Sequence, residues 1–307
     1  MRILVTGGAG FIGSALCNQL IEADHEVRVI DDLSAGEKDR LDPRVQLTRG
    51  DVADIPKLWR LLLDVDCVYH LAARVSVPES IKYPRDYNHV NVGGTVSVME
   101  AMRDAGVRRV VLASSGAVYG QQAQSTLHED LIPDPDSPYA VSKLAAETYV
   151  RTIGTLWGIE TVALRIFNAY GPHQQLPPSH PPVIPRFLRS ALTGASVVIY
   201  GDGHQTRDFV YLDDIVDALV SASTAPDVDR QVINVGSGQP TSLLELIDTI
   251  GAISGREIEP IHNMQQSAGV RSMCADLNRA HELLNFTPKI GLREGLERTI
   301  QLDERFH

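Results

Sequence analysis

Tyr139 and Lys143 are the residues whose types and spacing most directly suggest chemistry. They lie four positions apart in a stretch that is expected to be helical, so both side chains should share one face of the helix. A neighbouring ammonium group favours phenolate, which would lower the pKa of Tyr139 and suit it to act as a general base. This spacing alone is often an amphipathic coincidence. Ser115, however, ends a predicted strand, where it could hydrogen-bond a reacting hydroxyl.

A second group of residues could hold a phosphate. Gly7, Gly10 and Gly13 are spaced three apart, between a predicted strand and a predicted helix. One glycine allows a tight turn with positive φ, a second allows backbone N–H groups to approach a pyrophosphate, and a third lets helix and strand pack closely. A mere turn is the alternative, but the position near the N-terminus favours a dinucleotide site.

An acid about 20 residues further on would define which dinucleotide binds. Asp31 ends the second predicted strand, where its carboxylate can accept hydrogen bonds from both hydroxyls of an adenosine ribose. It would repel a 2′-phosphate, which favours NAD over NADP. The alternative role for Asp31 or Asp32 is a turn or helix-capping carboxylate, and this role suits Asp32 better.

Alternating short apolar runs and helical patterns should position these residues. We expect strands at 2–6, 26–31, 45–49, 67–72, 109–113 and 161–166, and helices at 11–23, 55–63, 84–104 and 138–156. Ser137 suits the N-cap of the last helix, with Pro138 in its first turn. The alternation predicts an α/β fold with a doubly wound parallel sheet of the Rossmann type over residues 1–170.

The pattern changes after Tyr170. A proline-rich segment at 171–185 is predicted to be a loop, because proline fixes φ and lacks an N–H donor. Beyond it we expect helices near 186–192, 213–223, 242–253, 276–284 and 292–302, and strands near 197–200, 208–211 and 231–235. Residues 171–307 should form a smaller substrate-binding domain, with segments near 207–236 returning to the main sheet.

Composition excludes several classes of function. The chain has 307 residues and a formal net charge of −11, which argues against binding nucleic acid or anionic membranes. It has no run of about 18 apolar residues that would span a membrane. Cys17, Cys67 and Cys274 fit neither a disulfide framework nor a metal-binding spacing, and we expect buried thiols in a reducing cytoplasm.

Taken together, the motifs resemble those of the extended short-chain dehydrogenase/reductase superfamily, and within it the nucleotide-sugar epimerases that act on UDP-glucose or UDP-N-acetylglucosamine. They are TGGAGFIG at 6–13, Asp31, the pair Gly50 and Asp51, HLAA at 70–73, the serines at 114–115, the pair Tyr139 and Lys143, RIFN at 165–168 and ADLNRA at 275–280. The resemblance covers nearly the whole chain and is more specific for the superfamily than for the substrate.

The resemblance implies a role for each matching residue. Ser115, Tyr139 and Lys143 would be catalytic. NAD would lie against Gly7, Gly10, Phe11, Ile12, Gly13, Asp31, Asp32, Asp51, Val52, Leu71, Ala72, Ala73, Tyr139 and Lys143. The nucleotide sugar would contact Ser115, Tyr139, Asn168, Val198, Tyr200, Arg207, Arg271 and Met273, with Asn168 and Arg207 at the diphosphate and the Tyr200 ring stacked on the base. A surface ion pair with Asp208 or Asp213 is the alternative for Arg207.

Departures from related patterns narrow the reaction. The 4,6-dehydratases and decarboxylases of the superfamily carry acids in the segment that here reads SGAVY at 115–119, so elimination and decarboxylation lack their acid or base. Glucuronate epimerases place an arginine and a threonine where this chain has Gln175 and Asn168, which favours a neutral hexose. Met273 does not decide whether an acetamido group fits.

The segment expected near the diphosphate of the substrate differs from the family pattern. The segment 266–269 reads QSAG where an Arg-Pro-Gly-Asp sequence is usual, which leaves Arg271 as the nearest cation and puts the choice of UDP in doubt.

The predicted function is therefore a UDP-hexose 4-epimerase that keeps its NAD bound. The alternatives are an enzyme for another nucleotide sugar, such as a UDP-glucuronate epimerase or a reductase, and an NAD-binding sensor without turnover. The helices at 84–104 and 138–156 should pair with their counterparts in a homodimer, as in the family that the chain resembles.

Overall fold

The computed structural model describes residues 1–177, 180–264 and 270–307. Its centre is a seven-stranded sheet in the order β11-β7-β5-β4-β1-β2-β3, in which every neighbouring pair is parallel. The strands are β1 (Arg2–Thr6), β2 (Glu26–Asp31), β3 (Gln46–Arg49), β4 (Cys67–His70), β5 (Arg109–Ser115), β7 (Glu160–Ile166) and β11 (Gln231–Val235). The predicted parallel sheet is confirmed.

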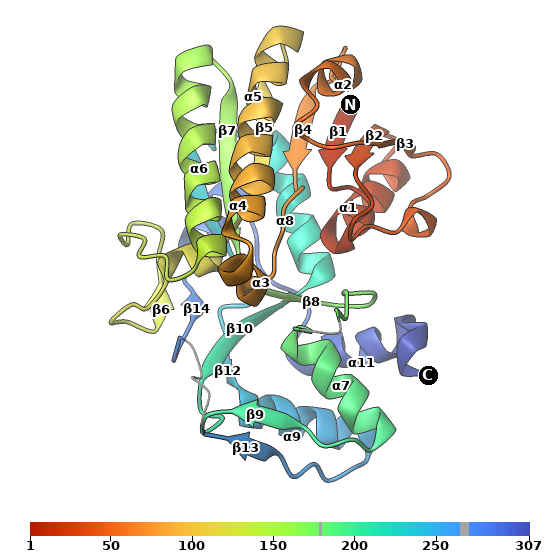
Figure 1. Ribbon diagram of the computed structural model, residues 1–307, viewed down its shortest axis with the longest axis vertical. Helices are drawn as coiled ribbons and strands as arrows, with labels where there is room; N and C mark the ends of the chain where they lie inside the picture. The colour runs from red at the N-terminus through yellow and green to blue at the C-terminus, as the bar shows by residue number, and fades with distance from the viewer. Residues whose placement is uncertain (178–179, 265–269) are drawn as a thin grey trace.

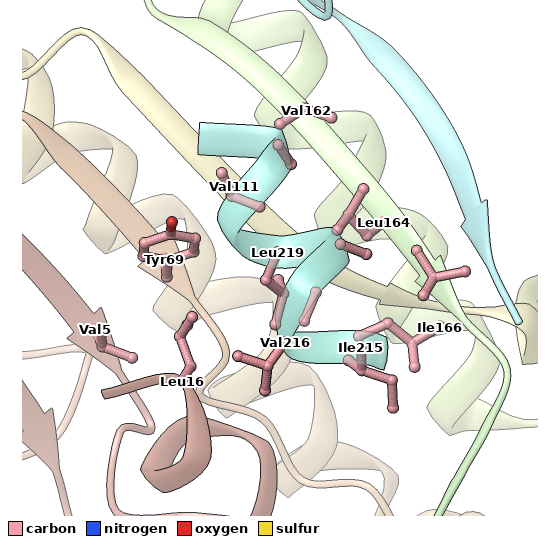
Figure 2. Packing of buried hydrophobic residues seen from close by; sticks show 14 of the residues in the cluster. Val5, Leu16, Tyr69, Val111, Val162, Leu164, Ile166, Ile215, Val216 and Leu219 are labelled. Atoms are coloured by element: carbon pink, nitrogen blue, oxygen red, sulfur yellow. The ribbon is translucent and has the colours of Figure 1, made fainter. Parts of the chain in front are cut away.

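Helices cover both faces of this sheet (Figure 1). On one face lie α1 (Phe11–Glu22), α8 (Leu212–Thr224) and α10 (Asn278–Leu284); on the other lie α2 (Ile55–Leu61), α5 (Gly94–Ala105) and α6 (Pro138–Trp157). Figure 2 shows Ile215, Val216 and Leu219 of α8 against Val111 and Leu164 of the sheet. The central strands β1, β4, β5 and β7 are buried on both sides, which explains their mostly apolar sequences.

The predicted helix at 84–104 is one helical run with an irregular centre. It consists of α4 (Pro84–Tyr87), a π turn η2 (Asn88–Gly93) and α5. A short helix before it, α3 (Val77–Lys82), was not predicted. Its six residues are too few for an apolar period to be recognised in the sequence.

The C-terminal part surrounds a separate apolar cluster. Its helices are α7 (Val183–Thr193), α9 (Leu243–Ser254) and α11 (Leu292–Leu302), and its strands are β8 (Asn168–Tyr170), β9 (Val198–Tyr200), β10 (Thr206–Tyr211), β12 (Pro240–Ser242) and β13 (Ile261–Asn263). Figure 1 places this part beyond the carboxyl ends of the main strands. β10 pairs with β8 and β12, whereas α8 and β11 pack with the main sheet.

One predicted boundary is wrong in this part. The proline-rich loop was expected to extend to residue 185, but α7 begins at Val183 and includes Pro185. Proline is tolerated in the first turn of a helix, because those N–H groups have no partner within the helix. Two further short strands, β6 (Thr126–Leu127) and β14 (Cys274–Ala275), pair with each other and had no recognisable pattern in the sequence.

The part of the chain that the structure describes also contains three one-turn helices, η1 (Lys38–Arg40), η3 (Gly116–Tyr119) and η4 (Glu304–Phe306). Among the helices of the described residues, none is long and apolar enough to cross a membrane.

Candidate active site

A cavity of about 620 Å³ opens where the carboxyl ends of β1, β4, β5 and β7 meet the C-terminal part. This edge is where open parallel sheets bind their ligands. Its wall includes every cofactor residue predicted from the sequence, together with the three predicted catalytic residues and Asn168. Five predicted substrate residues are not part of this wall: Val198, Tyr200, Arg207, Arg271 and Met273.

The glycine turn after β1 fits a pyrophosphate. Gly7 has a φ of +69°, and a Cβ there would lie 2.7 Å from the backbone nitrogen of Ala72. A Cβ on Gly13 would collide with the carbonyl oxygen of Gly7. Gly10 is the N-cap of α1 and supplies no side chain to cap it. The amino end of α1 therefore faces the cavity with bare backbone, which is the arrangement that binds dinucleotide phosphates.

Asp31 lies beside this turn and is buried. Its carboxylate accepts hydrogen bonds from the backbone nitrogens of Ala9 and Leu33, both at 2.9 Å. Burial raises the pKa of Asp31, and these two hydrogen bonds oppose the shift. Asp32 accepts from the backbone nitrogen of Ser34 at 2.8 Å, as expected for a turn carboxylate.

Gly36 is a residue that sequence reasoning missed here. It lines the same cavity, and a Cβ on it would lie 2.9 Å from a carboxylate oxygen of Asp31. The loop after β2 thus needs a glycine to close over Asp31. In the sequence Gly36 stands as a lone glycine after the second strand. Many surface loops contain such a glycine, so it did not indicate a cavity residue.

The predicted catalytic residues meet at the start of α6. Ser137 caps the helix by accepting from the backbone nitrogen of Ala140 at 3.3 Å, and Pro138 occupies the first turn. Tyr139 and Lys143 are both buried, and the ammonium group of Lys143 donates to the carbonyl oxygen of Ala113 at 2.9 Å. The helix and the end of β5 therefore converge as the spacing predicted.

The acidity of Tyr139 differs from the expectation. Burial raises the pKa of Tyr139, and a hydrogen bond with Ser115 opposes the shift. Burial also lowers the pKa of Lys143 to about 8. The four-residue spacing indicates the attraction between ammonium and phenolate but not the removal of both groups from water, which disfavours each charged form.

Asn91 is a second residue that the sequence analysis missed. It lies in the π turn, where its Oδ1 accepts from the backbone nitrogen of Arg74 at 2.8 Å. Its Nδ2 donates to the carbonyl oxygen of Arg74 and to Oγ of Ser142, at 3.0 Å and 2.9 Å. Asn91 thus ties the cavity loop after β4 to α6. Such π turns often occur at functional sites, but no sequence period reveals them.

Val198, Tyr200 and Arg207, which were predicted to hold the nucleotide, lie outside the wall of this cavity. Val198 and Tyr200 lie on β9 and are 36% and 37% exposed. The guanidinium of Arg207 donates to the carbonyl oxygen of Thr206 at 2.7 Å.

Arg271 and Met273 lie further along the chain. Arg271 pairs with Asp202 at 3.5 Å in an exposed ion pair, and Met273 packs against the apolar cluster that includes Phe167. The atypical segment 266–269 lies outside the described residues.

Comparisons with known proteins agree with this geometry. The model of the NAD dependent epimerase/dehydratase family matches residues 3–236. The UDP-glucose 4-epimerase of Mycolicibacterium smegmatis is 38% identical over 309 residues, covering 98% of each chain. The solved UDP-glucose 4-epimerase of Thermotoga maritima, with UDP-glucose, is 34% identical with a TM-score of 0.94, covering 98% of each chain.

A third relative acts on a different sugar. It is the UDP-N-acetylglucosamine 4-epimerase of Methanobrevibacter ruminantium, solved in complex with UDP-N-acetylmuramic acid. It is 33% identical, with a TM-score of 0.93, covering 98% of this chain and 97% of its own. The chain therefore belongs to the NAD-dependent epimerase/dehydratase family and is an isomerase similar to the UDP-glucose 4-epimerases.

Proposed function

We propose that this protein, as a nucleotide-sugar 4-epimerase, interconverts UDP-glucose and UDP-galactose through transient oxidation at C4 of the sugar. The observation that carries the proposal is one cavity lined by Ser115, Tyr139 and Lys143 together with the glycine turn and Asp31. A cavity built only to bind a dinucleotide has no need of a proton acceptor beside a hydrogen-bonding serine.

Each residue of the candidate active site would have its own part in the reaction. NAD, held by the glycine turn and Asp31, would supply a reversible hydride acceptor for C4 of the sugar. Tyr139 takes the proton of the 4-hydroxyl, and Ser115 aligns that hydroxyl by hydrogen bonding. The hydrogen bond with Ser115 also lowers the pKa of Tyr139 against the effect of burial. Lys143 is held in place by the carbonyl oxygen of Ala113 and contributes positive charge on the same helical face.

The nucleotide sugar is proposed to bind in the C-terminal part, residues 171–307, beyond Asn168. Asn168 and Gln175 both line the cavity, and neither carries a charge. A carboxylate bound at these two amides would lose its hydration without gaining a cation from either position, which favours a neutral hexose. The segment 115–119 contributes no acid, so the cavity offers no group there for elimination of water from the sugar.

One observation favours UDP-glucuronate as a second candidate. The side chain of Arg74 is exposed, lines the same cavity and lies with its guanidinium 6.0 Å from the ring centre of Tyr87. That guanidinium could pair with a sugar carboxylate. Arg74→Gln should then abolish turnover of the acidic sugar while leaving UDP-glucose turnover within about threefold.

The test is a panel of nucleotide sugars incubated with the purified protein without added NAD, with products separated by chromatography. Conversion of UDP-galactose to UDP-glucose supports the proposal. UDP-N-acetylglucosamine and UDP-glucuronate belong in the panel because they distinguish the alternatives. Release of NADH in proportion to product would instead identify a net dehydrogenase, and tight NAD binding without any turnover would identify a sensor.

We also propose that the protein forms a homodimer through α5 and α6 and works in a reducing cytoplasm. Val141, Tyr149 and Leu156 of α6 are exposed apolar side chains, which supports an interface on this helix. Cys17, Cys67 and Cys274 are free thiols, which supports the location.

A further inference from the structure

A buried polar layer lies directly behind the proposed catalytic residues. It contains Ser114, Glu147 and Arg165, each of which is less than 5% exposed. Ser114 Oγ donates to Glu147 Oε2 at 2.9 Å. Arg165 donates to both carboxylate oxygens of Glu147, from Nε at 3.1 Å and from Nη2 at 2.8 Å. The proposed reaction uses none of these three side chains.

We propose that the Glu147–Arg165 ion pair positions the active site, by fixing the end of β5 against α6 so that Ser115 stays in register with Tyr139. This inference rests on the proposed function, because it assigns Glu147, Arg165 and Ser114 a part in the same proton transfer. They are positioning residues, since they act through Ser115 and Tyr139.

The spacing along α6 supports this role. Tyr139, Lys143 and Glu147 follow one another at four-residue intervals, so they occupy one face over successive turns. Two of them bond the end of β5: Lys143 bonds the carbonyl oxygen of Ala113, and Glu147 bonds Ser114. Tyr139 lies with Ser115 in the cavity wall. Glu147 thus continues the row of contacts that holds the two catalytic side chains.

Arg165 extends the layer to the neighbouring strands. It lies opposite Ser114 in the parallel register of β5 and β7. Its guanidinium is 4.7 Å from the ring centre of Tyr119, whose hydroxyl donates to Asn234 Oδ1 of β11 at 2.7 Å. The two-point contact with Glu147 fixes direction as well as distance, because the guanidinium and carboxylate are both planar.

Close packing of the protein core does not by itself require this buried polar layer. A buried ion pair often stabilises a core no better than apolar side chains of the same volume, because both charges must leave water. A pair that joins a helix to two strands does, however, define one orientation of the three elements. Small displacements matter at the site it supports, since a misplacement of about 1 Å can lower a rate by about 100-fold.

The decisive variant is Ser114→Ala. It removes the hydrogen bond that joins Glu147 of α6 to β5, and it leaves the Glu147–Arg165 ion pair intact. We expect kcat to fall about 10- to 100-fold, with KM and bound NAD within about threefold of the parent. Glu160→Gln is the matched control, because Glu160 pairs with Arg109 at the opposite ends of the same two strands. It should leave kcat unchanged. Val216→Ala in the core controls for lowered stability alone.

A second measurement does not depend on turnover. In protein labelled with ¹³C at the ζ carbon of tyrosine, the Tyr139 signal, assigned by its loss in Tyr139→Phe, reports the surroundings of the Tyr139 hydroxyl, Ser115 included. We expect this signal to shift in Ser114→Ala and not in Glu160→Gln. An unshifted Tyr139 signal, or a kcat of Ser114→Ala within threefold of the parent, would overturn the positioning role. A parent that converts no nucleotide sugar refutes the proposed function instead, and the Tyr139 signal still decides the positioning role.

Discussion

At the scale of single residues, Tyr139 carries the clearest expectation. Tyr139→Phe removes one oxygen and keeps the buried ring, so folding and NAD binding should persist. Loss of the base should lower kcat on the best substrate by about 10²- to 10⁴-fold. Product formation measured at saturating nucleotide sugar checks this, with bound NAD quantified after denaturation as the control. Turnover within threefold of the parent would exclude Tyr139 as the base.

Asp31 should decide the preference between the two dinucleotides. Asp31→Ala removes the carboxylate proposed to contact the ribose, so NAD should bind more weakly and NADP should no longer be excluded. The same change removes the hydrogen bonds to Ala9 and Leu33, so the stability must be measured alongside. Dissociation constants for both dinucleotides give the answer, and Asp32→Ala is the control. If the parent binds NADP as tightly as NAD, the role of Asp31 is wrong.

His70 should make the stability depend on pH. It is buried, and burial lowers its pKa to about 3. Its Nε2 bonds Thr95 Oγ1 at 2.9 Å and its Nδ1 bonds Thr6 Oγ1 at 2.7 Å. Thr95 Oγ1 already donates to the carbonyl of Asn91, so Nε2 carries the proton and Nδ1 accepts. Both nitrogens are therefore satisfied in the neutral ring.

Because the unfolded His70 has a pKa near 6.5, the unfolded chain binds more protons at pH values between about 6.5 and 3. The stability due to this residue is thus complete above about pH 6.5 and is lost as the pH falls toward 3. Between pH 7.5 and 5 the parent should lose roughly 2 kcal/mol of unfolding free energy more than His70→Gln. Urea unfolding at both pH values measures the difference; equal losses would contradict it.

At the scale of elements, the turn from β1 into α1 cannot accept a side chain at Gly13. Gly13→Ala should cost about 1–3 kcal/mol, because its Cβ meets the backbone of Gly7 rather than a movable side chain. Bound NAD should fall at the same time, since the turn proposed to hold the pyrophosphate must shift. Gly291→Ala is the control, because its Cβ would have no neighbour within 4 Å. Thermal unfolding and NAD content measure both effects, and two unchanged values would refute the close packing.

At the scale of the whole molecule, the proposed dimer should depend on the exposed face of α6. Tyr149 is 46% exposed in the single chain, and Tyr149→Arg would place a charge in the proposed interface. We expect a dimer for the parent and a monomer for the variant in sedimentation at micromolar concentration. Ile261→Arg is the control, because Ile261 is 54% exposed on β13, which Figure 1 shows far from α6. A monomeric parent would rule out the dimer.

The sequence by itself determined the parallel sheet, the glycine turn and the convergence of Ser115, Tyr139 and Lys143. These features depend on short-range patterns: apolar strands covered on both faces, glycines at fixed spacing, and a helical interval of four. Side chains at the carboxyl ends of neighbouring parallel strands must lie at one edge of the sheet, and the start of α6 meets the end of β5 there, so these two elements bring the candidate site together.

Only the tertiary structure decided what depends on contacts between distant segments. The direction of the Tyr139 pKa shift follows from how much water the surrounding chain excludes, which no spacing reveals. The contacts of Asn91 and Glu147 arise because the π turn, α6, β5 and β7 pack together. Likewise α7 could include Pro185 because the proline falls in its first turn, and that position depends on where the helix begins after it packs on the C-terminal cluster.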